Sequence, residues 1–149
     1  MTSTDLPTQL ADIREDFLAL EQSDRLQLLL EFSNELPALP ERYQDHPDLF
    51  ERVVECQSPV FIFVEVDQDL AVHLYATAPA ESPTTRGFAS ILAQGLDGLS
   101  IEEVLAVPDD FPQTIGLTQA VSPLRLRGMT AMLGRTKRQL RERQAALTA

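Results

Sequence analysis

One residue in this chain offers strong nucleophilic chemistry: Cys56, the only cysteine among 149 residues. It lies in the segment VVECQSPVFIF (residues 53–63), where the polar neighbours Glu55, Gln57 and Ser58 precede a proline and an apolar run. This context is typical of a loop that leads into a strand, and such a loop can present a thiol. A thiolate there could attack a sulfur atom and keep it as a persulfide, by the chemistry of disulfide exchange. The alternative is a small buried side chain that only packs.

The sequence lacks the other common catalytic motifs. It contains no Gly-rich phosphate-binding loop, no H-E-x-x-H zinc motif and no G-x-S-x-G nucleophile elbow. His46 falls in a polar, proline-flanked segment and His73 on the outer face of a predicted strand, so we expect neither to serve as a base for Cys56. A single cysteine cannot make an internal disulfide and supplies too few ligands for a structural zinc or iron–sulfur site. We therefore expect no metal and no cofactor in this chain, and a reducing compartment around it.

The charge distribution bears on the kind of partner. The formal net charge of −11, from 12 basic and 23 acidic residues, argues against a nucleic acid, because such affinity comes largely from cations that neutralise phosphates. Seven of the basic residues gather near the carboxyl end: Arg125, Arg127, Arg135, Lys137, Arg138, Arg141 and Arg143. One interpretation is a solvated face near the end of a helix, and the other is a docking surface for an acidic partner.

Length and hydropathy set the broad class. No stretch approaches the apolar length of a membrane span, and the start MTSTDLP has no basic region of the kind that opens a signal peptide. We therefore expect no contact with a membrane and a cytoplasmic location. A length of 149 residues suits one ordinary domain, so we expect a single domain over residues 1–149.

The elements before the cysteine are predicted to be helical. Apolar residues recur at helical spacing over residues 10–20 and again over 26–33, which predicts two short amphipathic helices. Ser23 is the expected N-cap of the second helix, and Pro37 is expected to end it. Residues 36–50 hold three prolines and little periodicity, so this segment is predicted to be an extended connector.

The segment after the cysteine is predicted to form a β-hairpin. Residues 60–66 and 70–77 alternate with period two around the polar turn Asp67–Asp69. Large apolar or aromatic side chains fall on both faces, so we expect helices to cover one side of the sheet and loops or a partner to cover the other.

The second half of the chain is predicted to be helical again. Apolar spacing over residues 88–96 predicts one helix, and Ser100 with Glu103 fits a capping box at the start of another. Ser122 followed by Pro123 marks the start of a long final helix. Its apolar stripe consists of Leu126, Met129, Leu133 and Leu140. The predicted fold class is therefore α+β, a small antiparallel β-sheet packed by several α-helices.

Several blocks of the sequence resemble the motifs of one known family. CQSPVF at residues 56–61 looks like the family's C-Q-S-x-V-W motif, and EFSNELPALPE at 31–41 is similar to the segment that precedes it. GFASILAQGLDGLSIEEVLAV at 87–107 is similar to the family's central helix and its capped successor. IGLTQAVSPLRLRGMTAM at 115–132 is similar to the signature G-L-x-x-x-L-S-P-S-R-x-x-G-L-x-x-M. These blocks resemble the SufE-type sulfur-acceptor proteins. The resemblance covers residues 24–143, and the family's α+β fold agrees with the prediction above.

The resemblance implies a function. Members of this family take persulfide sulfur from a partner cysteine desulfurase of the SufS type and stimulate that enzyme during iron–sulfur cluster assembly. Cys56 corresponds to the sulfur-accepting cysteine, and Gln57 and Ser58 to the motif residues that shape its loop. Arg125 occupies the arginine position of the S-P-x-R motif, where it could contact the loop or the partner and, if close to the sulfur, lower the thiol pKa. Pyridoxal phosphate is expected on the desulfurase only, and a cluster-assembly scaffold is the expected sulfur recipient.

Two other roles are compatible with the same resemblance. A pure adaptor or regulator would dock on the desulfurase without carrying sulfur. A cluster scaffold of the related fold would need several ligands around one site, whereas this chain has one cysteine. A hydrolytic thiol enzyme is disfavoured because neither histidine is a convincing base.

One position departs from the family pattern next to the thiol. The family usually has glycine before the cysteine, and this chain has Glu55. A glutamate restricts the backbone at that position and adds a negative charge beside the sulfur. We therefore expect a more restrained loop or a higher thiol pKa than in a typical member.

Overall fold

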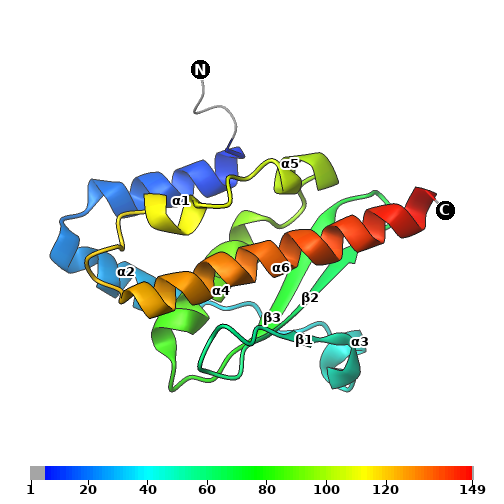
Figure 1. Ribbon diagram of the computed structural model, residues 1–149, viewed down its shortest axis with the longest axis horizontal. Coiled ribbons are helices and arrows are strands. Elements are labelled where there is room, and N and C mark those ends of the chain that lie inside the picture. Colours follow the sequence, from blue (N-terminus) through cyan, green and yellow to red (C-terminus); the bar gives the residue numbers. More distant parts are fainter. Residues whose placement is uncertain (1–5, 149) are drawn as a thin grey trace.

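The computed structural model describes residues 6–148 and shows an α+β fold in which a three-stranded sheet packs against helices (Figure 1). Residues 1–5, where the sequence predicts no targeting signal, lie outside the described part, as does residue 149. The elements are α1 (Thr8–Ala19), α2 (Gln22–Asn34), α3 (Glu41–Gln44), η2 (Pro47–Leu49), β1 (Glu51–Arg52), β2 (Phe61–Val66), β3 (Val72–Thr77), α4 (Pro83–Gly95), α5 (Ile101–Leu105), η3 (Phe111–Thr114) and α6 (Pro123–Thr148).

The predicted hairpin is confirmed. β2 and β3 pair antiparallel over their full length, from Phe61 opposite Thr77 to Val66 opposite Val72. The turn between them contains Leu70 with a φ of 64°, a left-handed conformation that a non-glycine residue rarely adopts. β1 adds two residues to the other edge of β2, so the sheet order is β1-β2-β3. A strand this short leaves no periodicity in the sequence, so the sequence does not predict it.

Both faces of the sheet are covered, as predicted. The inner face is apolar and buried, with Ile62 and Val64 of β2 fully inaccessible, and it packs against α4 and α6. On the outer face, the ring of Tyr43 from α3 lies 5.1 Å from that of Phe63 and 5.4 Å from that of Tyr75. Segment 36–50 is therefore not simply extended, because it forms α3 and η2 and places aromatic rings on this face.

Helix α2 begins and ends earlier than predicted. It starts at Gln22, with Glu21 at the N-cap position, so Ser23 lies inside the first turn and caps nothing. The cause is the tight link to α1, which Arg25 fixes by donating from Nε to the carbonyl oxygens of Phe17 (2.9 Å) and Leu20 (3.2 Å). At the other end the helix stops at Asn34, before the restriction that Pro37 imposes.

The predicted starts of α5 and α6 are confirmed. Ser100 and Glu103 form the reciprocal bonds of a capping box at α5. The backbone N–H of Arg125 donates to Ser122 Oγ (3.3 Å) at the first turn of α6. The stripe predicted for α6 (Leu126, Met129, Leu133 and Leu140) is buried. Among residues 6–148, no helix combines the length and the apolar character needed to cross a membrane.

Helix α6 crosses the whole molecule and completes the sheet (Figure 1). Beyond the two residues of β1, the outer edge of β2 has no neighbouring strand within the described residues. Side chains of α6 take its place: Val64 donates its N–H to Gln139 Oε1 (2.9 Å), and Arg143 Nε donates to the Val64 carbonyl oxygen (3.1 Å). An exposed strand edge can pair with other chains, so this cover satisfies the backbone and protects the edge.

Candidate functional site

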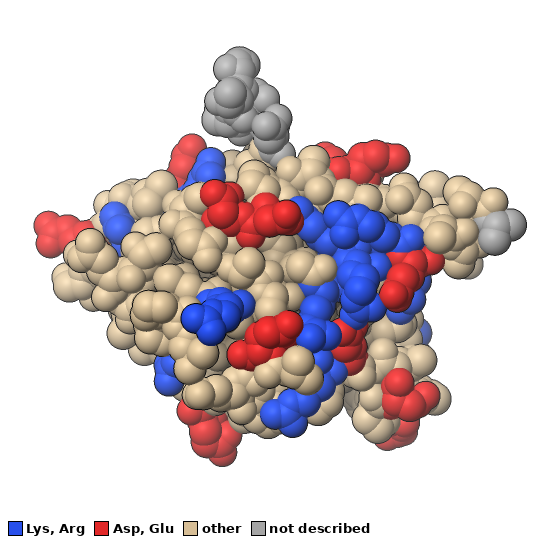
Figure 2. All heavy atoms as spheres, viewed as in Figure 1, with Lys and Arg blue, Asp and Glu red and all other residues tan. Residues whose placement is uncertain are grey.

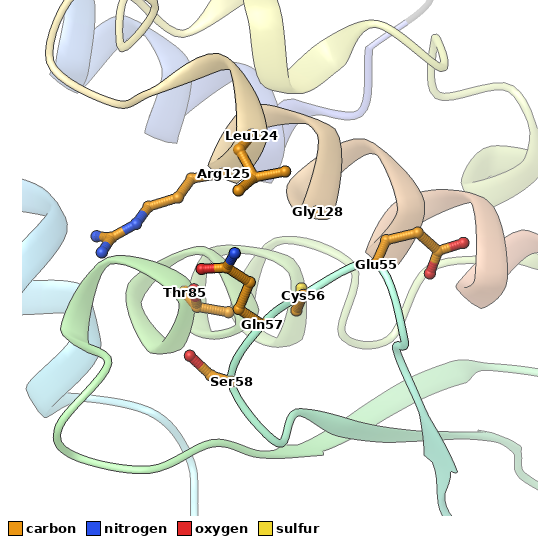
Figure 3. Close-up of a pocket in the computed structure, with 8 residues that line it drawn as sticks. All are labelled: Glu55, Cys56, Gln57, Ser58, Thr85, Leu124, Arg125 and Gly128. Atoms are coloured by element: carbon orange, nitrogen blue, oxygen red, sulfur yellow. The ribbon is translucent and has the colours of Figure 1, made fainter.

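Cys56 lies in a tight loop between β1 and β2. The loop is closed at its base by the N–H of Val53, which donates to the carbonyl oxygen of Val60 (2.8 Å). Inside it, the N–H of Cys56 donates to the Val53 carbonyl oxygen (3.0 Å). Figure 3 shows the Cys56 sulfur turned toward α6, and only 6% of the residue is exposed. The loop therefore holds the thiol inward, and does not present it at its tip.

A glycine on α6 makes room for the sulfur. A Cβ atom placed on Gly128 would lie 2.9 Å from Cys56 Sγ, closer than real contacts allow. The sulfur therefore packs where any other residue would place a side chain. Gly128 belongs to the S-P-x-R block of the sequence, although its role becomes visible only through the fold.

The residues singled out by sequence meet at one small cavity. Its volume is about 40 Å³, which suits a small group and excludes a metabolite. The lining residues are Glu55, Cys56, Gln57, Ser58, Thr85, Leu124, Arg125 and Gly128 (Figure 3). The sequence identifies Cys56, Gln57, Ser58 and Arg125. It does not identify Thr85 and Leu124, since their positions in helices give no chemical signal.

The polar residues of the cavity are oriented differently from one another. Ser58 Oγ is hydrogen-bonded to Ser82 Oγ (2.5 Å), which ties the loop to the start of α4. The Arg125 side chain is exposed and extends away from the Cys56 sulfur in Figure 3, while Glu55 points to the opposite side. Arg125 thus borders the site without reaching the thiol in this conformation.

Burial dominates the acidity of the thiol. The pKa of Cys56 is raised from an ordinary value of 9.0 to about 11. Loss of solvent is the largest cause of this rise, and the neighbouring Glu55 carboxylate is the second. Arg135 opposes both and lowers the pKa. The expected effect of Glu55 is present but is second to burial, and the cation that acts on the thiol is Arg135 and not Arg125. At neutral pH the closed loop therefore holds a protonated thiol.

Four of the seven basic residues near the carboxyl end bind groups of this same chain: Arg135, Lys137, Arg138 and Arg143. Figure 2 shows Lys and Arg side chains gathered over the second half of α6, with acidic side chains next to them. Arg135 binds Glu55 and Glu51, and Arg138 binds Glu51 and Glu142. Lys137, only 4% exposed, binds the Val107 carbonyl oxygen and the Asp109 carboxylate (2.7 Å for the latter). The first three of these four cations therefore bind acids of this same chain, whereas Arg125, Arg127 and Arg141 are exposed, as the predicted solvated face requires.

The histidines do not serve the thiol. His73 is held by two carboxylates, with Nε2 2.8 Å from Asp67 and Nδ1 2.7 Å from Asp97. His46 is exposed, and its nearest acid is Asp48 at 3.8 Å. Over residues 6–148, no group of three or more acidic, cysteine or histidine side chains has the geometry to bind a metal ion.

A comparison with known protein families assigns this chain to a family. The family model described as "SufE: Fe-S metabolism associated domain" matches residues 11–140, which include the cysteine loop and the first part of α6. The chain belongs to the SufE family. Its role accordingly lies in iron–sulfur metabolism.

Relatives of this SufE-family chain occur in distant organisms. An uncharacterized SufE-like protein of Mycobacterium tuberculosis is 54% identical over 137 residues, which cover 92% of this chain and 94% of that protein. SufE-like protein 1, chloroplastic/mitochondrial, of Arabidopsis thaliana is 28% identical over 130 residues, covering 87% of this chain and 34% of that longer protein. The solution structure of a hypothetical protein from Thermus thermophilus shares the fold, with a TM-score of 0.81 and 40% identity over 97% of this chain and 99% of that one.

Proposed function

We propose that this SufE-family protein accepts persulfide sulfur on Cys56 from a SufS-type cysteine desulfurase, stimulates that enzyme and delivers the sulfur for iron–sulfur cluster assembly. The observation that carries the proposal is the single cysteine of the chain, held in a loop against a small cavity that also collects Gln57, Ser58 and Arg125. Family membership supplies the metabolic setting. A cluster-assembly scaffold is the proposed recipient, and the cytoplasm is the proposed location.

The chemistry of transfer is a substitution at sulfur. The Cys56 thiolate attacks the terminal sulfur of a persulfide on the desulfurase, a new S–S bond forms at Cys56, and the S–S bond on the enzyme breaks. The enzyme's cysteine leaves as a thiolate, so the sulfur moves without net oxidation or reduction. The proton lost by Cys56 balances the one taken up by the departing thiolate. Pyridoxal phosphate acts earlier, on the desulfurase, and no cofactor is required here.

Transfer requires the loop to change. A sulfur that is 6% exposed and has a pKa of about 11 is a poor nucleophile in water at neutral pH. We propose that the loop extends when the protein docks, which exposes the thiol inside the partner and removes the burial that raises its pKa. The closed loop then protects a redox-sensitive cysteine between transfers.

Arg125 is proposed to act on the partner side. It is exposed at the rim of the cavity beside Leu124, an exposed apolar residue, and no acid of the described chain binds its guanidinium. Arginine next to an apolar side chain is common at protein interfaces. Replacement of Arg125 by alanine should weaken stimulation of the desulfurase and leave alkylation of the free thiol unchanged.

The buried thiol also favours a second candidate function, an adaptor that stimulates the desulfurase without carrying sulfur. Intact-protein mass spectrometry separates the two after incubation with cysteine and a SufS-type desulfurase. A reducible gain of one or more sulfur atoms on the wild type, absent from Cys56→Ser, is the expected result. Full stimulation by Cys56→Ser with no mass gain on the wild type would overturn the transfer proposal and leave the adaptor.

A further inference from the structure

The loop that carries Cys56 is fastened to α6 by one arginine. Arg135 donates from Nε to Glu55 Oε1 (2.8 Å) and from Nη2 to Glu55 Oε2 (3.1 Å), so it grips this carboxylate with two bonds. Its remaining nitrogen, Nη1, donates to Glu51 Oε2 (2.5 Å). Glu51 lies in β1, at the fixed base of the loop, and Glu55 lies directly before the cysteine. Arg135 thus joins the part of the loop that carries the cysteine to the strand at its base.

The two carboxylates depend on Arg135 to different extents. Glu51 also accepts from Arg138 and from Gln139 Nε2, so it keeps two donors if Arg135 is lost. Within the described residues, Arg135 is the one side chain that binds the Glu55 carboxylate. Removal of Arg135 therefore releases Glu55 while leaving the base of the loop held.

Glu55 lies within the segment that would have to move for the loop to open. The backbone bond between Val53 and Val60 closes the base, so residues 54–59 form the part that can swing out. Glu55 is the sole charged residue among these six positions. The other side-chain tie of this segment is the neutral bond between Ser58 and Ser82. The ion pair with Arg135 is therefore the charged contact that must break when the thiol leaves α6.

We propose that Glu55 and Arg135 form a latch that keeps the Cys56 loop closed, and that docking of the sulfur donor must open this latch before transfer. The inference rests on the proposed function, of which it names the regulation. Both are positioning residues, since they act through the loop and not on the sulfur that is transferred. The pair is partly exposed, with 24% of the Arg135 side chain and 38% of the Glu55 side chain accessible. Ion pairs of this kind are weak enough for a partner to break.

Replacement of Arg135 by glutamine distinguishes a latch from a purely electrostatic effect. Arg135 lowers the thiol pKa, so its loss alone would make less thiolate and slow the reaction of Cys56 with an alkylating agent. Loss of a latch has the opposite result, because the loop opens more often and exposes the sulfur. The direction of the change therefore decides between the two.

The experiment measures alkylation of Cys56 by iodoacetamide in the free protein at one fixed pH. We expect Arg135→Gln to react about two- to fivefold faster than the wild type, the range set by a partly exposed ion pair. The matched control is Arg138→Gln, which removes a cation from the same helix and a bond to Glu51 but no bond to Glu55. A rate for Arg135→Gln equal to or below that of the wild type would overturn the latch.

A second variant guards against loss of fold. Glu55→Gln removes the same ion pair at an exposed side chain and should also speed alkylation, both because the loop opens and because the acid that raises the thiol pKa is gone. A rate no faster than that of the wild type would overturn the latch. Glu142→Gln, which removes an exposed acid paired only with Arg138 among the described residues, should leave the rate unchanged. Glu55→Asp, which keeps the charge, should react more slowly than Glu55→Gln, and equal rates would overturn the role of the charge. None of these measurements uses a desulfurase. A failure of sulfur transfer would therefore remove the proposed function without changing the rates that test the latch.

Discussion

The Cys56 thiol is held in a state that suppresses its own reactivity. Burial raises its pKa to about 11, and Glu55 on one side is offset by Arg135 on the other. Under the proposed function, in which the thiol reacts only inside a partner, this arrangement means that water and oxidants meet a protonated and covered sulfur between transfers. Because burial is the largest cause of the raised pKa, the acidity of the thiol depends on the conformation of the loop.

The raised pKa also makes stability depend on pH. A thiol whose folded-state pKa lies above its unfolded value holds its proton more tightly when folded, so its contribution is present below about pH 9 and is lost as the pH rises toward 11. Between about pH 8 and about pH 10, the wild type should lose about 1 kcal/mol more free energy of unfolding than Cys56→Ser. Urea denaturation at the two pH values measures this. Identical losses in the two proteins would show that the thiol is not buried in solution.

The sequence can identify the residues of the loop but not the cation that restrains it. Cys56, Gln57, Ser58 and Arg125 are predicted from local motifs, and the fold brings them to one cavity. Arg135 lies 80 positions from Glu55, and only the crossing of α6 over the loop makes them neighbours. Long-range ion pairs of this kind have no pattern in a single sequence.

At the level of elements, α6 accommodates the cysteine loop through the absence of a side chain. Gly128 faces the sulfur, whereas Gly134, on the same helix, has open space around its Cα. Both should gain helix propensity on replacement by alanine, about 1 kcal/mol each. At Gly128 the new methyl group would meet Cys56 Sγ at 2.9 Å, so the sulfur must move out.

The pair of variants therefore has two different expected outcomes. Gly134→Ala should raise the free energy of unfolding by about 1 kcal/mol and leave alkylation of Cys56 unchanged. Gly128→Ala should gain less stability and should speed alkylation, because the displaced thiol is more accessible. Chemical denaturation and alkylation rates test both. Equal behaviour of the two variants would mean that Gly128 does not hold the sulfur in place.

Sequence patterns recover the longer elements and miss the short ones for a physical reason. The β2–β3 hairpin, the capping box of α5 and the start of α6 each follow from local chemistry that a few residues contain. β1 has two residues and α3 has four, too few to show a period. Their positions are set by contacts with the finished sheet, through pairing with β2 and aromatic packing on its outer face.

At the scale of the whole molecule, α6 links the cysteine loop, the sheet and the α5–η3 connection. Gly128 faces the loop, Lys137 holds the connection at Val107, and Gln139 satisfies the edge of β2. The Gln139 side chain is 5% exposed and bonds the N–H of Val64 together with the Glu51 carboxylate. One amide thus fastens the sheet and the base of the loop to the same helix.

Replacement of Gln139 by leucine tests this role. Leucine has a similar size, but it leaves the Val64 N–H buried without an acceptor, so the free energy of unfolding should fall by about 1–3 kcal/mol. Gln144→Leu, on the same helix at a half-buried position, should change stability by less than about 0.5 kcal/mol. Chemical denaturation compares the two.

Because the open edge of β2 could then pair with another chain, Gln139→Leu should also self-associate at high concentration, as light scattering would show. Equal stabilities of the two variants would mean that the edge of β2 does not need α6.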